Sequence, residues 1–202
     1  MWENETLNTF ADMLLLNLSW IIATLPVITA GASMSAMYIV MRKRMQGTGE
    51  WSVSLFWRRF HEELKTATPL WLLELFVLGI AILCFHFSTM HFAEAPFFFG
   101  FLECTSVLVL IMTASLSCFL YPLLSCYENT IFQQVRNACL LAITHPFRTI
   151  AVLLLWAAPA YLALFMPVLF LRIGFLLPTI AFSFLFYISG RLLLPVVLAL
   201  GI

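Results

Sequence analysis

Residues 154–171 read LLWAAPAYLALFMPVLFL, a run of eighteen residues without a charged side chain. A strand of a membrane barrel would alternate apolar and polar residues, and this run does not. A helix needs about 20 apolar residues to cross the roughly 30 Å hydrocarbon core of a bilayer. The stretch therefore predicts a helix that crosses a membrane.

The chain as a whole is too apolar for a soluble protein. Of its 202 residues, 63% are hydrophobic and 10% are charged, whereas soluble domains average about 45–50% and about 25%. Lys plus Arg and Asp plus Glu each number ten, so the net charge is zero. This composition excludes a soluble enzyme, a secreted disulfide scaffold, a disordered chain and a basic nucleic-acid binder. We expect contact with the lipid bilayer and none with nucleic acid.

Four further apolar stretches accompany this run, and backbone groups in lipid must be paired within helices. We expect an all-α, polytopic membrane helical bundle that forms a single membrane domain over residues 1–202. About five transmembrane helices are predicted, at 7–28 or 14–40, 70–90, 98–124, 150–171 and 174–194. Two amphipathic helices are predicted on the cytoplasmic side, at about 51–65 and 128–143.

The first span has two interpretations around Pro26. A straight helix over 14–40 would be about 40 Å long, which exceeds one crossing without tilt. Either the helix is kinked at Pro26, or the crossing covers 7–28 and a second helix begins near Ser33. We favour the second interpretation, because small and hydroxyl residues follow Pro26 and suit a break and a cap.

Small residues four apart continue this segment: Gly31, Ala32, Ser35 and Ala36. Such residues let two membrane helices approach closely. The alternative is a broken helix whose exposed backbone lines a polar cavity.

The cations are distributed unevenly over these spans. Nine of the ten Lys and Arg residues fall on one side, and the exception is Arg172 in a predicted outer turn at residues 172–174. The positive-inside rule then places the N-terminus outside and the C-terminus in the cytoplasm. Five basic residues are expected at the membrane interface: Arg42, Lys43, Arg44, Arg58 and Arg59.

Both predicted cytoplasmic helices are amphipathic. In 51–65, aromatic and aliphatic residues recur at helical spacing, and we expect this face on the bilayer with the cations toward lipid phosphates. In 128–143, the apolar stripe is Ile131, Val135, Cys139 and Ala142. The opposite, polar side is Gln133, Gln134, Arg136 and Asn137. These helices either stabilise the fold or bind a partner, and the sequence does not separate the two roles.

A weak internal repeat relates residues 25–30 to residues 121–126. Each hexapeptide has a bulky residue, Pro, two aliphatic residues, a hydroxyl residue and a small residue. Each precedes an amphipathic helix, a proline and a further span. We therefore predict a parallel two-fold repeat of two spans each, with the fifth span added.

Ionisable residues inside predicted spans are the candidate functional residues, because a charge in lipid costs about 2.5–3.5 kcal/mol on insertion scales. Glu103 and His86 fall in the outer halves of neighbouring spans and could approach each other, either as a structural hydrogen bond or on a proton or solute path. Glu74 lies near the inner end of its span and could reach water, Arg58 or Lys65. Pro26 joins these residues as a candidate because it breaks or bends its span.

The sequence gives no sign of catalysis, and we expect no enzyme activity, cofactor or metal. His61 and Glu62 start an H-E-x-x-H pattern that has no second histidine. No Gly-rich phosphate loop and no nucleophile elbow is present. The five cysteines have no C-x-x-C spacing and suit packing.

Several short motifs together resemble the YesL family of bacterial integral membrane proteins, which is a domain of unknown function. In the first half these are Asn17–Trp20, Leu25–Gly31, Ala36–Tyr38 and Phe56–Phe60. In the second half they are Tyr127–Thr130, Arg136–Ala138 and Ala142–Pro146. The last two spans agree with the family in hydropathy alone.

The resemblance implies a multi-pass protein of the bacterial cytoplasmic membrane. Family members often accompany carbohydrate uptake and degradation systems, so it implies an accessory or assembly subunit beside a carbohydrate transport system. Transporter subunits and further copies of the chain are the expected partners. The alternative is a stand-alone small-solute transporter or channel. It is favoured by the predicted repeat, by Pro26 and by Glu103. A membrane-embedded enzyme has scattered carboxylates and histidines in its favour.

Overall fold

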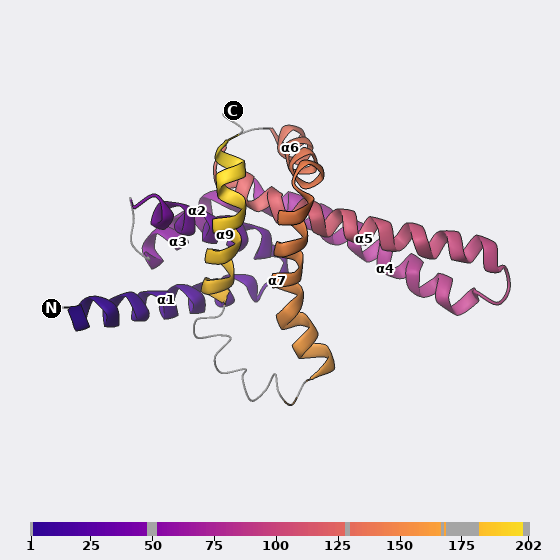
Figure 1. The fold of residues 1–202 in the computed structure, drawn as a ribbon, viewed down its shortest axis with the longest axis horizontal. Coiled ribbons are helices and arrows are strands. Elements are labelled where there is room, and N and C mark those ends of the chain that lie inside the picture. The colour runs from indigo at the N-terminus through magenta and orange to yellow at the C-terminus, as the bar shows by residue number, and fades with distance from the viewer. Residues whose placement is uncertain (1, 48–51, 128–129, 167, 169–181, 200–202) are drawn as a thin grey trace.

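The structure is a computed structural model that describes residues 2–47, 52–127, 130–166, 168 and 182–199. All regular secondary structure in these residues is helical, as predicted (Figure 1). The elements are α1 (Trp2–Thr24), the 3-10 helix η1 (Val27–Thr29), α2 (Ala30–Met45), α3 (Val53–Glu63), α4 (Ala67–His91), α5 (Pro96–Leu124), α6 (Ile131–Thr144), α7 (Pro146–Phe165) and α9 (Phe182–Leu198).

Helices α4 and α5 form a long antiparallel hairpin that extends away from the other helices (Figure 1). With 25 and 29 residues, both are long and apolar enough to cross a membrane. Many of their large apolar side chains are exposed, among them Leu83, Phe97 and Phe101. The predicted spans 70–90 and 98–124 are therefore confirmed as helices of membrane-spanning length.

The remaining helices are shorter or bent. The chain bends by 116° between Ala11–Thr24 and Val27–Met45, and by 100° between Ile131–Thr144 and Pro146–Pro159. If each bent pair counts as one span, the described residues hold up to four spans, and α9 is a shorter apolar helix. Helix α7 covers much of the predicted span 150–171. The first part of the predicted span 174–194 and the turn at 172–174 lie outside the described residues.

The chain breaks at Pro26, as the favoured interpretation predicted, but the next helix begins earlier than Ser33. A 3-10 turn over Val27–Thr29 leads directly into α2. The break leaves carbonyl groups without helical partners, and the indole Nε1 of Trp71 on α4 donates to the Val27 carbonyl at 2.6 Å. This bond ties the break to the α4–α5 hairpin.

Helix α2 runs through the centre of the molecule, and nearly all its residues from Ala30 to Met41 are buried. Gly31 makes the close packing possible, because a Cβ here would lie 2.5 Å from the Cβ of Trp71. The packing role predicted for the small residues of this segment is therefore confirmed at Gly31.

The face of α3 that was expected to lie on the bilayer is instead covered by protein. Phe56 and Phe60 belong to the buried cluster that α1, α2 and α9 build around Trp20, Met37 and Phe186. The reason is that α3 packs against α2 and α1. Its aromatic face serves as core.

The apolar stripe predicted on α6 does not coincide with the side that packs on the protein. The helix buries Gln134, Asn137, Ala138 and Leu141, and it packs on α5. Ile131 and Cys139 of the stripe are exposed, whereas Val135 and Ala142 are partly buried against the core. An exposed apolar stripe suits the predicted contact of this helix with the bilayer.

The two hexapeptides of the predicted repeat differ locally. Helix α1 ends before Pro26, whereas α5 continues through Pro122 to Leu124. The parallel arrangement of the two halves stays a prediction.

Candidate functional site

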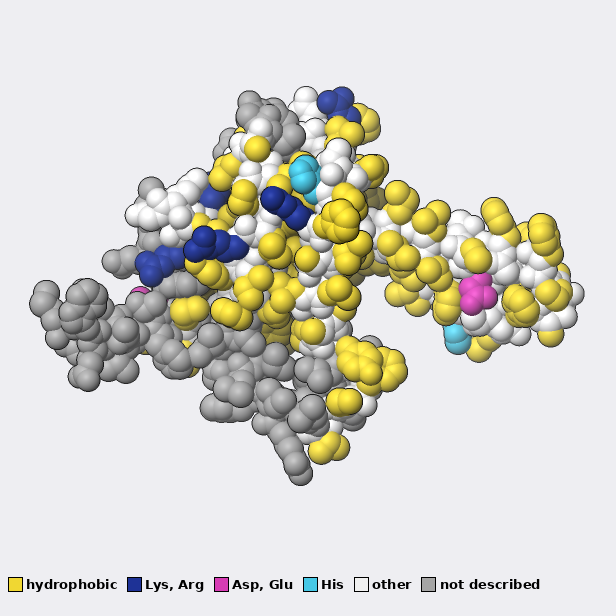
Figure 2. Space-filling model, in the orientation of Figure 1, with side chains coloured by type: hydrophobic (Ala, Val, Ile, Leu, Met, Phe, Trp, Pro, Cys, Tyr) yellow, Lys and Arg dark blue, Asp and Glu magenta, His cyan; other side chains and the backbone are white. Residues whose placement is uncertain are grey.

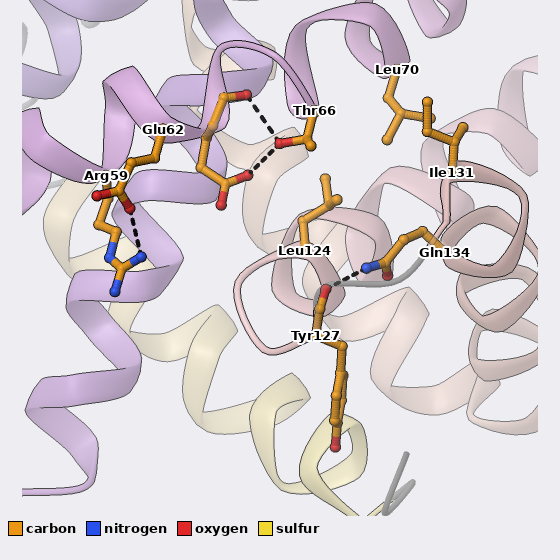
Figure 3. A pocket seen from close by; sticks show the side chains of 9 residues that line it. Arg59, Glu62, Thr66, Leu70, Leu124, Tyr127, Ile131 and Gln134 are labelled. Atoms are coloured by element: carbon orange, nitrogen blue, oxygen red, sulfur yellow. Dashed lines mark hydrogen bonds and ion pairs between the residues drawn. The ribbon is translucent and has the colours of Figure 1, made fainter.

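A cavity of about 290 Å³ lies where two helical corners meet, the α3–α4 corner and the α5–α6 corner (Figure 3). We call it the corner cavity. It is lined by Arg59, Glu62, Glu63, Thr66, Leu70, Leu124, Tyr127, Ile131 and Gln134. Polar side chains from α3 therefore face polar groups from the start of α6 across an apolar floor.

On the α3 side, the guanidinium of Arg59 is joined to the carboxylate of Glu62, with 2.6 Å between Nη1 and Oε2. Both side chains are partly exposed, so this ion pair adds little stability by itself. The Nε of Arg59 is buried and has no hydrogen-bond partner among the described residues. This nitrogen is therefore an unpaired donor within a side chain that lines the cavity.

Glu63 and Thr66 close the turn between α3 and α4. The Thr66 hydroxyl donates to the Glu63 carboxylate at 3.2 Å and to the Glu63 carbonyl at 3.4 Å (Figure 3). The Thr66 amide also donates to that carbonyl, at 3.2 Å. Burial raises the pKa of Glu63, and the nearby Ser35 and Thr66 hydroxyls and the Arg59 guanidinium oppose that rise only in part. Glu63 thus holds a proton to higher pH than an exposed glutamate.

On the opposite wall, Gln134 is 1% exposed. Its amide Nε2 donates to the Tyr127 carbonyl at 2.6 Å, which orients the side chain (Figure 3). Its Oε1 is buried and has no partner among the described residues. The Tyr127 hydroxyl in turn donates to the Val197 carbonyl at 3.2 Å and fixes this corner to α9.

Two side chains that line the corner cavity each carry a buried polar atom without a partner among the described residues, the donor Arg59 Nε and the acceptor Gln134 Oε1. Buried polar atoms are almost always hydrogen-bonded in folded proteins, so a group bound in the cavity would satisfy them once these side chains turn toward it. The arrangement suits recognition of a polar group that is both a donor and an acceptor. Within the part of the chain that the structure describes, no three His, Cys, Asp or Glu side chains are grouped to hold a metal ion.

The structure places the predicted candidate residues outside this cavity. Glu74 is 5% exposed. It accepts hydrogen bonds from the Ser117 hydroxyl at 3.0 Å and the Tyr121 hydroxyl at 2.7 Å. Its carboxylate is therefore bound by α5, and it forms no ion pair with Arg58 or Lys65.

Glu103 and His86 lie on the α4–α5 hairpin, where Glu103 is partly buried and His86 is exposed. Among the described residues, no hydrogen bond or ion pair joins their side chains. Pro26 precedes η1, and its carbonyl accepts the Thr29 amide at 2.7 Å. These three residues therefore share no site.

The predicted interface cations gather on the helices around α2 and α3. Arg42, Lys43 and Arg44 occupy the last turn of α2, and Arg58 and Arg59 lie on α3. Dark blue Lys and Arg side chains appear on the main body in Figure 2, and none appears on the visible face of the α4–α5 hairpin. On this face, the Lys and Arg side chains therefore lie on the main body and not on the α4–α5 hairpin.

Sequence reasoning missed most of the corner cavity. Glu63, Thr66 and Gln134 carry no motif, and Gln134 was assigned to the polar side of its helix. The available signals were the motif that begins at Tyr127 and the amphipathic pattern of the two segments at 51–65 and 128–143, because both segments contribute to the cavity.

Comparison with protein families matches residues 13–85 to the family described as "Protein of unknown function, DUF624". The match runs from α1 into α4 and includes the α3–α4 wall of the corner cavity. Neither a curated protein nor a solved structure matches the chain.

Proposed function

We propose that this protein is an accessory subunit of a bacterial transport complex, and that the corner cavity receives a segment of a partner subunit. The observation that carries the proposal is the pair of unpaired buried atoms, Arg59 Nε and Gln134 Oε1. A peptide backbone carries both complementary groups, a carbonyl acceptor for the Arg59 side chain and an N–H donor for the Gln134 side chain. Such a contact needs no particular side chain of the partner.

The position of the cavity supports this role. Nine of the ten Lys and Arg residues fall on the side of the predicted topology that carries the segments 51–65 and 128–143, and both of these segments line the cavity. By the positive-inside rule we assign this end to the cytoplasm, with the N-terminus outside. A cytoplasmic loop of a partner would therefore reach the cavity without entering the membrane.

The link to transport comes from the resemblance to the YesL family, whose members often accompany carbohydrate uptake systems. The polar groups of the corner cavity are suited to binding and include no nucleophile paired with a base, so we assign the chain no enzyme activity. Self-association through the lipid-facing helices remains compatible with this role.

Site-specific photo-crosslinking in cells grown on the transported sugar tests the proposal. A photoreactive residue at position 131 lies in the cavity wall, whereas one at the neighbouring exposed position 132 lies outside it. We expect crosslinks from Ile131 to a transporter subunit, and few or none from Phe132. Equal yields at both positions, or crosslinks to lipid alone, would contradict docking in the cavity.

The alternative function is a stand-alone transporter or channel for a small solute, and the buried carboxylate of Glu74 favours it. An ionisable group inside a span is a functional candidate by its cost alone. Reconstituted vesicles distinguish the two functions, because an accessory subunit gives no solute flux by itself and a transporter does.

A further inference from the structure

A second cavity of about 290 Å³ lies in the middle of the molecule, between α2, α4, α5, α7 and α9. Five aromatic side chains, one from each helix, contribute to its wall: Tyr38, Trp71, Tyr121, Trp156 and Phe186. We call it the aromatic cavity. We propose that it binds a small lipophilic organic cation, a substituted amine or quaternary ammonium, whose charge is stabilised by Glu74.

The carboxylate of Glu74 lies directly behind the cavity wall. Ser117 and Tyr121 line the cavity, and both donate hydroxyl hydrogen bonds to Glu74, at 3.0 Å and 2.7 Å. Glu74 itself follows Trp71 by three residues and so lies on nearly the same side of α4. A positive charge in the cavity would be one hydroxyl group away from the carboxylate.

No cation of the protein balances this carboxylate among the described residues. The sequence has no Lys or Arg between Lys65 and Arg136, which covers all of α4 and α5. Arg148 donates to the Leu192 carbonyl at 3.0 Å, and Arg191 contacts Tyr187. A buried carboxylate without a counter-ion is unfavourable, so a cation that enters the cavity is stabilised by its attraction to Glu74.

The aromatic rings suit the same charge. Cations bind to the faces of aromatic rings, Trp most strongly, and quaternary ammonium groups are the usual ligands of such walls. The indole of Trp71 donates to the Val27 carbonyl at 2.6 Å, and that of Trp156 donates to the Ser189 hydroxyl at 3.1 Å. Both indoles are therefore held in place before a ligand arrives.

The surroundings disfavour other ligand classes. The Glu74 carboxylate would repel an anion, and a metal ion such as Ca²⁺ or Mg²⁺ needs about six oxygen ligands where this wall is mostly apolar. The volume is at the lower limit of ordinary ligand pockets, about 300–1,000 Å³. The ligand is accordingly small, with an apolar body around one positive charge.

Binding of radiolabelled benzyltrimethylammonium to the purified full chain in detergent tests the proposal. Neopentylbenzene has nearly the same shape without the charge and serves as the neutral competitor. We expect saturable binding, with unlabelled benzyltrimethylammonium competing at least tenfold better than neopentylbenzene. Absence of saturable binding, or equal competition by the two compounds, would overturn the proposal.

Two matched variants locate the charge. Glu74→Gln keeps the side-chain shape and one acceptor oxygen, and its amide nitrogen can donate to the second hydroxyl oxygen. We expect it to weaken binding of the cation at least tenfold. Glu103→Gln removes a carboxylate from the same hairpin outside the cavity and should leave binding unchanged. Native affinity in Glu74→Gln would overturn the assignment. If Glu74→Gln does not fold, the comparison of charged and neutral competitors on the native chain decides.

Discussion

At Gly31, α2 and α4 approach each other closely. A Cβ there would lie 2.5 Å from the Trp71 Cβ and 2.9 Å from the Ala67 carbonyl oxygen, whereas one on Gly79 would have no atom within 4 Å. We expect Gly31→Ala to lower the free energy of unfolding by about 1–3 kcal/mol, because the two helices must separate. Gly79→Ala should raise it by about 0.5–1 kcal/mol. Thermal unfolding in detergent, followed by circular dichroism, checks both, and similar losses in the two variants would contradict this account.

Glu63 makes the stability of the molecule depend on pH. Burial raises its pKa, so the folded chain keeps this proton at pH values where the unfolded chain has lost it. Stability therefore falls as the pH rises from the ordinary glutamate value of about 4.3 through the raised pKa. We expect the melting temperature of Glu63→Gln minus that of the native chain to increase from pH 4 to pH 7. A constant difference over this range would mean that the pKa of Glu63 is not raised.

At the scale of the helix, two neighbouring leucines test which side of α6 is buried. Leu141 is 4% exposed and Leu140 is 52% exposed. We expect Leu141→Ala to lower the free energy of unfolding by about 2–5 kcal/mol, because it leaves a cavity against α5. Leu140→Ala removes the same atoms from the outer side and should cost much less. Chemical denaturation in mixed micelles measures both, and a larger loss in Leu140→Ala would mean that the Leu140 side of α6 is the buried one.

The helices themselves could be predicted from the sequence because hydropathy and length decide them. The predicted spans 70–90 and 98–124 correspond to helices at 67–91 and 96–124. Which side of a helix faces inward could not be predicted in the same way, since lipid is as apolar as a protein core. For α6 the apolar stripe therefore does not identify the buried side, which includes Gln134 and Asn137.

For the whole molecule, both cavities depend on contacts between distant parts of the chain. Glu74 could be selected from the sequence, because an acid within a span is costly, but its partners Ser117 and Tyr121 lie 43 and 47 residues further on. The corner cavity likewise joins α3 to α6. No spacing rule connects such segments, so the sequence can indicate single candidate residues and not the contacts between them.

At the scale of the whole molecule, we predict the orientation in the membrane from the charge asymmetry, and this prediction is open to a direct test. Thr66 lies at the α3–α4 turn and Glu94 at the α4–α5 turn, and the 25 residues of α4 separate them. A helix of this length spans about 37 Å, which is enough for one crossing. In a background with all five cysteines replaced, a membrane-impermeant maleimide should label Glu94→Cys on intact spheroplasts. It should label Thr66→Cys only after the membrane is permeabilised. The reverse pattern would place the basic end outside, contrary to the positive-inside rule, and would exclude a cytoplasmic partner for the corner cavity.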